Sequence, residues 1–94
     1  MSEIEHYDIQ VLGKVQGVFF RASAREVAAR LGITGWVKNE EDGSVKIEAE
    51  GTEKQLGEFL KYCKEGPKNS IVDEVKISSG TVKHFENFEI IRQS

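Results

Sequence analysis

The residues best suited to chemistry lie between Gly13 and Arg21, where the chain reads GKVQGVFFR. An alternating apolar segment ends there, and a segment with helical periodicity begins. Two glycines allow the backbone to turn its N–H groups inward, and Arg21 enters the following helix. Peptide N–H groups, a helix N-terminus and a planar guanidinium can together bind phosphate. The stretch therefore predicts a phosphate-binding loop, and a glycine-containing turn with a surface arginine is the alternative reading.

The elements that must position this loop follow from the periodicity of the flanking residues. Residues 6–11 alternate between polar and apolar side chains, which predicts a half-buried first strand. Apolar residues at 24, 27, 28 and 31 have helical spacing, and Gly32 is placed to end that helix. A second helix is expected to begin at Thr52, whose partner in a capping box is Gln55, and to end at Gly66-Pro67.

The remaining segments predict four further strands, over 33–39, 45–50, 71–79 and 88–92, with a hairpin turn at Asp42-Gly43. The order is then β-α-β-β-α-β plus a short C-terminal strand in one domain, residues 1–94. This order predicts the α+β class and a ferredoxin-like split βαβ sandwich, an antiparallel sheet with both helices on one face. The first two strands would run parallel with the third between them, so their ends would lie about 10 Å apart. Arg21 and Asn39 could therefore face one ligand.

Composition narrows the partner classes. The net charge is −3 with acids and bases mixed along the chain, which argues against a nucleic-acid partner. No apolar run approaches the roughly 18 residues that a membrane span needs, and the acidic N-terminus is unlike a secretory signal. We therefore expect a cytoplasmic protein without membrane association. Cys63 is the single cysteine, which excludes an internal disulfide and predicts a small core residue.

Other residues that could carry chemistry have simpler interpretations. His6 and His84 are expected to be surface or sheet-face histidines without a metal-ligand partner. The acidic residues at 40–42 are explained by a solvated hairpin. Trp36 and Phe20 are expected to be residues of the hydrophobic core. Phe19 could line the pocket.

Two motifs of the sequence resemble those of the acylphosphatase family. The first runs from Val11 to Arg21, and the second is GWVKN at 35–39, followed by glycines at 43 and 51 and Val45. Gly66-Pro67 and the region 72–75 resemble the family's second helix exit and fourth strand. The resemblance covers nearly the whole chain, and its two motifs are spaced independently.

The resemblance implies hydrolysis of the carboxyl–phosphate bond of a small acyl phosphate, without a metal or cofactor. Arg21 would hold the phosphoryl group, and Asn39 would orient the attacking water. The loop that would supply backbone N–H donors comprises Val15, Gln16, Gly17, Val18, Phe19 and Phe20. Inorganic phosphate would be product or inhibitor, and the protein would act as a monomer.

Two other function classes remain open from the sequence. This domain type also occurs fused to larger carbamoyl-phosphate-handling proteins, so an isolated copy could bind anions without turnover. The same topology also supports RNA-binding sheets, which display aromatic and basic residues on their open face. Here that face is expected to carry polar residues from 6 to 10 and acids and lysine from 46 to 50, so RNA binding is disfavoured.

Overall fold

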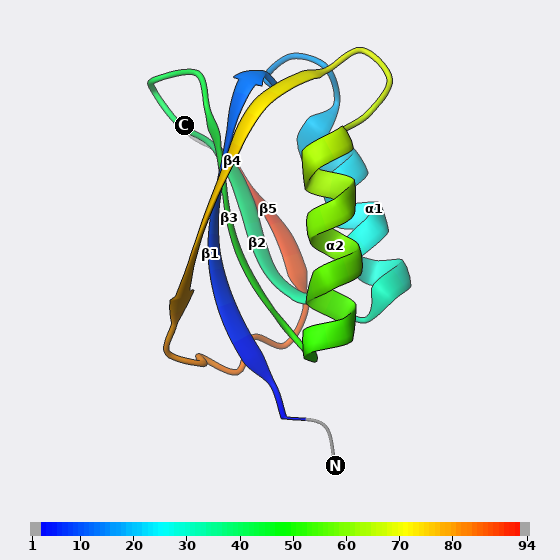
Figure 1. Ribbon diagram of the computed structural model, residues 1–94, viewed down its shortest axis with the longest axis vertical. Helices are drawn as coiled ribbons and strands as arrows, with labels where there is room; N and C mark the ends of the chain where they lie inside the picture. The colour runs from blue at the N-terminus through cyan, green and yellow to red at the C-terminus, as the bar shows by residue number, and fades with distance from the viewer. Residues whose placement is uncertain (1–2, 93–94) are drawn as a thin grey trace.

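The computed structural model describes residues 3–92, which form one five-stranded sheet with two helices packed on one of its faces (Figure 1). Both predicted helices and all five predicted strands are present. Their bounds are β1 (Glu5–Lys14), α1 (Phe20–Leu31), β2 (Thr34–Asn39), β3 (Val45–Gly51), α2 (Glu53–Glu65), β4 (Ile71–Gly80) and β5 (Phe88–Ile91).

The strand order is β4-β1-β3-β2-β5. β3 pairs antiparallel with β1 and β2, which confirms that it lies between two parallel strands. β5 pairs with β2 in parallel, so the prediction of an antiparallel sheet holds for the first four strands and not for the fifth. The cause is the 81–87 loop, which leaves the lower end of β4 and crosses to the opposite edge of the sheet (Figure 1). β5 starts at that end and therefore runs in the same direction as β2.

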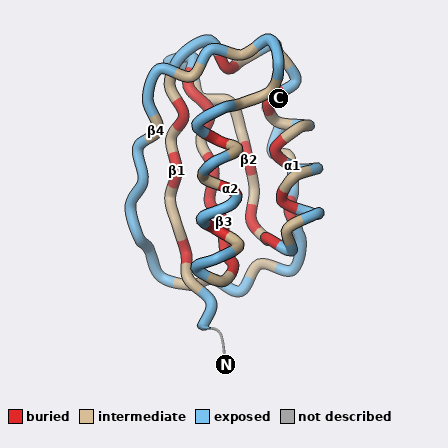
Figure 2. Tube along the Cα trace, turned by 45° about the vertical axis from the view of Figure 1, so that its right-hand side comes forward, coloured by how far each residue is buried: buried red, intermediate tan, exposed pale blue. Residues whose placement is uncertain are grey.

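The hydrophobic core lies between the sheet and the helices. Figure 2 shows buried positions along β1, β3 and the sheet-facing sides of both helices. Phe20 of α1 and Phe59 of α2 are fully buried, and Phe59 meets the ring of Phe88 edge-on with centroids 5.9 Å apart. Each such side chain contributes about 1.5–3 kcal/mol to stability by leaving water. This core holds the start of α1 against the sheet, and with it the loop that enters α1.

The helix ends are as the sequence predicts. Gly32 follows α1 with φ 80°, and its N–H donates to carbonyl oxygens of the last turn. Thr52 caps α2: its Oγ1 accepts from the N–H of Gln55, while the Gln55 side chain accepts from the N–H of Thr52. No helix in the 3–92 range is long and apolar enough to cross a membrane.

Trp36 does not occupy the core position that we predicted. Strand alternation turns Val37 toward the helices, where it is fully buried, and therefore turns Trp36 toward the helix-free face. There the ammonium of Lys38 lies 5.7 Å from the centroid of the indole ring. The apolar character of Trp36 alone could not show which face it occupies.

Candidate active site

A pocket of about 350 Å³ lies where the β1–α1 loop, the start of α1 and the ends of β2 and β5 meet. In Figure 1 this is the upper end of the molecule. Arg21 and Asn39 both line the pocket, so the structure brings together the two residues that the sequence singled out. The lining residues are Val15, Gly17, Phe19, Phe20, Arg21, Ala22, Asn39, Ile90 and Arg92.

Left-handed backbone positions give the loop its shape. Gly13 has φ 131° at an irregularity in the pairing of β1 with β4, and a Cβ there would collide with the carbonyl oxygen of Ile71. Gly17 and Phe19 follow with φ 74° and 62°. Phe19 is the residue before α1 and remains 81% exposed, because its left-handed conformation turns the side chain away from the core. A non-glycine residue in that conformation is costly, and such strain is often found at functional sites.

The loop is held from behind by three side chains. Val15 is buried and Val18 packs against the core. The Gln16 amide Nε2 donates to the carbonyl oxygens of Glu40 and Ser44, at 2.8 and 2.9 Å. Gln16 therefore ties the loop to the turn between β2 and β3, the same turn that follows Asn39. Of the six predicted loop residues, Val15, Gly17, Phe19 and Phe20 line the pocket, whereas Gln16 and Val18 do not.

The loop leaves backbone donors available to a ligand. The N–H groups of Gln16, Gly17, Val18 and Phe19 donate to no acceptor within the part of the chain that the structure describes. The adjoining N-terminus of α1 has no side-chain cap and no acidic residue in its first turn. Uncapped N–H groups and the helix dipole make such an end favourable for an anion.

The charge of the pocket is positive. Among the residues that the structure describes, its lining holds the guanidinium groups of Arg21 and Arg92 and no carboxylate. Neither arginine forms an ion pair or hydrogen bond with another residue in the range 3–92. Sequence reasoning missed Arg92 and Ile90. Both residues reach the pocket because β5 pairs in parallel with β2, up to Lys38 and Ile91. That pairing is a property of the sheet, and no local pattern in the sequence indicates it.

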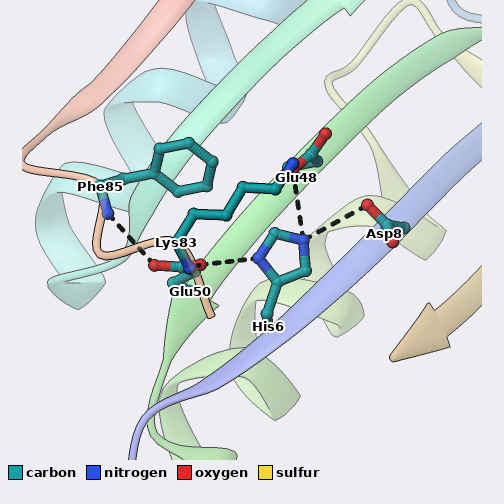
Figure 3. A network of polar contacts seen from close by, with 6 residues as sticks. All are labelled: His6, Asp8, Glu48, Glu50, Lys83 and Phe85. Carbon is teal, nitrogen blue, oxygen red and sulfur yellow. Dashed lines mark hydrogen bonds and ion pairs between the residues drawn. The ribbon is translucent and has the colours of Figure 1, made fainter. Parts of the chain in front are cut away.

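A second polar cluster lies on the helix-free face of the sheet (Figure 3). His6 is a sheet-face residue as predicted, but it is buried under the 81–87 loop, with 3% exposure. Its Nδ1 lies 2.7 Å from Glu50, and its Nε2 lies 3.3 Å from both Asp8 and Glu48. The expectation that His6 lacks metal-ligand partners was wrong, because strand register brings ligand atoms of His6, Asp8 and Glu48 within 4.8 Å of one another. The ammonium of Lys83 donates to Glu48 at 2.7 Å and supplies positive charge there.

Glu50 anchors the 81–87 loop within this cluster. Its carboxylate accepts the backbone N–H groups of Lys83 and Phe85, at 2.5 and 3.2 Å, in addition to the contact with His6. Burial raises the pKa of the Glu50 carboxyl, but the hydrogen bonds from Lys83, His6 and Phe85 outweigh it and lower the pKa below its usual range. No residue of the cluster lines the pocket, and its hydrogen bonds attach the 81–87 loop to the sheet.

Cys63 is fully buried in the core, as predicted. Burial raises the pKa of its thiol to about 12, which disfavours the thiolate that a nucleophile requires. The cysteine therefore belongs to the packing of α2.

Comparison with known proteins agrees with this geometry. The acylphosphatase family model matches residues 7–90. An acylphosphatase of Marinobacter nauticus is 50% identical over 72 residues, which cover 77% of this chain and 78% of that protein. The crystal structure of acylphosphatase from Bacillus subtilis superposes with a TM-score of 0.91 at 35% identity, covering 96% of this chain and all of the other. Full-length HypF in its phosphate- and nucleotide-bound form superposes at 0.87 with 30% identity, but only over 12% of its length. The chain belongs to the acylphosphatase family, the hydrolases that cleave acyl phosphates.

Proposed function

We propose that this pocket hydrolyses small acyl phosphates without a metal ion, with Arg21 holding the phosphoryl group and Asn39 orienting the water. The observation that carries this proposal is that Arg21, Asn39 and a loop with unused N–H groups border one pocket. The residues supply positive charge and hydrogen-bond donors, which are the main requirements of phosphoryl transfer.

The phosphoryl oxygens would be bound by the loop amides and by the N-terminus of α1. Arg21 lies in the first turn of this helix, between Phe20, which is buried, and Ala22, which also lines the pocket. The guanidinium can donate two parallel hydrogen bonds to two phosphoryl oxygens. This arrangement neutralises the charge that spreads over those oxygens in the transition state, and guanidinium and amide donors do so without a metal ion.

The chemical step would need no strong acid or base from the protein. Water attacks phosphorus, the bond from phosphorus to the acyl oxygen breaks, and the acid leaves as a carboxylate. A carboxylate has a conjugate-acid pKa near ~4, so it leaves without receiving a proton. The Asn39 side-chain oxygen would accept a hydrogen bond from the attacking water and orient it. A phosphoryl oxygen would accept the proton that the water loses, and inorganic phosphate is the second product.

The first test replaces Arg21 by lysine. Hydrolysis of acetyl phosphate is followed with a chelator present, and kcat/KM is expected to fall by on the order of 10² to 10³, because an ammonium cannot reproduce the guanidinium fork. Arg25→Lys is the matched control, since Arg25 lies one turn further along α1 and outside the pocket lining. We expect that control to retain activity within about twofold. Near-full activity of Arg21→Lys would refute the bidentate contact.

The second test separates the roles of the two residues. Asn39→Ala should lower kcat much more than it weakens inhibition by inorganic phosphate, because Asn39 acts on the water. An equal loss in both would reassign Asn39 to phosphate binding, and a clear gain in turnover for Asn39→Asp would contradict the proposed proton route. Phosphate binding by the unmodified protein without any turnover would instead identify an anion-binding module.

A further inference from the structure

We propose that Arg92 is a substrate-capture residue, which strengthens binding of the phosphoryl group without contributing to the chemical step. This inference rests on the proposed function of the pocket. It starts from the observation that the pocket has a second guanidinium, that of Arg92, just after the end of β5.

The parallel sheet pairing places Arg92. Val37 pairs with Ile90 and Lys38 with Ile91, so Arg92 directly follows the last paired residue of β5. Asn39 occupies the corresponding position at the end of β2. The helix α1, which carries Arg21, packs against both β2 and β5. A phosphoryl group in the pocket would therefore have Arg21 from α1 and Arg92 from the end of β5 among its neighbours.

No acidic group of residues 3–92 neutralises the charge of Arg92. Within that range Arg92 has no ion pair, and no carboxylate lines the pocket. A phosphoryl group carries nearly two negative charges near pH 7. We take the guanidinium of Arg92 and a bound phosphoryl group to be about 7 Å apart in water-like surroundings. Their Coulomb attraction, screened by salt, then corresponds to roughly a three- to eightfold gain in affinity for the phosphoryl group.

The setting of Arg92 indicates binding rather than transition-state stabilisation. Arg21 is carried by a helix whose buried residues fix its position, whereas Arg92 follows the short edge strand β5 and is exposed. An exposed side chain at a strand end attracts an anion through its charge, with little geometric constraint. Lysine should therefore replace Arg92 with little loss, in contrast to Arg21.

The test measures binding and turnover separately. Phosphate binding is measured by calorimetry, and acetyl phosphate hydrolysis by steady-state kinetics, for Arg92→Gln and Arg92→Lys at about 20 and 200 mM salt. We expect Arg92→Gln to raise the phosphate Kd and the KM by about three- to eightfold at low salt and less at high salt. The kcat should stay within about twofold, and Arg92→Lys should behave like the unmodified protein.

Lys54→Gln is the control for net charge. Lys54 is exposed near the N-terminus of α2, at the end of the molecule opposite the pocket, so its removal should leave the phosphate Kd unchanged (Figure 1). An unchanged Kd for Arg92→Gln, or a fall in kcat at constant KM, would overturn the capture role. If the unmodified protein binds phosphate but hydrolyses no acetyl phosphate, the proposed function is refuted. The comparison of phosphate Kd values between Arg92→Gln and the unmodified protein would still decide whether Arg92 captures the ligand.

Discussion

Glu50→Gln tests whether the buried carboxylate of Glu50 attaches the 81–87 loop to the sheet. The carboxylate accepts two backbone N–H groups and lies 2.7 Å from Nδ1 of His6. Glutamine keeps the size of the side chain but has only one oxygen, and its NH₂ group would face a donor. Oε2 accepts from Lys83 and His6, so the amide oxygen is expected in its place, and the N–H of Phe85 then loses its acceptor at a cost of roughly 1.5–3 kcal/mol. The other two hydrogen bonds lose their charge and weaken by about 1 kcal/mol each. We expect the free energy of unfolding to fall by about 3–5 kcal/mol at pH 7.

The pH dependence of this loss follows from the lowered pKa of Glu50. A carboxyl with a lower pKa in the folded state contributes stability above its unfolded pKa, and that contribution disappears as pH falls through the folded value. A protonated glutamic acid resembles glutamine in its hydrogen bonding. The difference between Glu50→Gln and the unmodified protein should therefore be complete at pH 7 and shrink below the ordinary pKa near 4.5.

Urea unfolding at several pH values measures the difference, and amide hydrogen exchange localises it to Lys83 and Phe85, which donate to Glu50. Glu26→Gln is the matched control, because Glu26 is exposed and only approaches Arg30 at 3.5 Å. That pair should contribute under about 0.5 kcal/mol. A loss below about 1 kcal/mol for Glu50→Gln at pH 7, or one that stays constant in acid, would refute the reasoning.

Three further predictions concern the core and the turns. Phe59→Ala should lower the free energy of unfolding by about 3–5 kcal/mol, because Phe59 is fully buried in the core. Trp36→Ala should lower it by only about 1–2 kcal/mol, because Trp36 lies on the helix-free face. Equal losses of stability in urea unfolding would contradict this assignment. Cys63 should react with a thiol reagent only after unfolding, because burial raises its pKa to about 12, and prompt labelling of the native protein would argue against it. Gly35→Ala should prevent folding, because a Cβ there would collide with a backbone carbonyl of β3. Gly43→Ala has open space around the new Cβ and should lower stability by about 1 kcal/mol through its positive φ. Similar thermal melts for the two variants would be inconsistent with this difference.

Local patterns in the sequence determined the elements and much of the pocket. The helical spacing before Gly32 and the capping box at Thr52 depend only on neighbouring residues, and the structure confirms both helix ends. The glycines of the loop and Arg21 at the start of α1 are close in sequence, so their joint effect on the backbone could be predicted. General rules of strand connection then sufficed to place Asn39 at the same pocket.

The tertiary structure decided what depends on the register and edges of the sheet. The parallel pairing of β5 with β2 brings Arg92 to the pocket, and the 81–87 loop buries His6 beside Glu50. Trp36 lies on the face without helices for the same reason, since its place depends on how β2 pairs with its neighbours. The contact between His6 and Glu50 joins residues that are 44 positions apart in the sequence. Local periodicity reports which side chains share a face of one element, and only the assembled sheet determines which elements face each other.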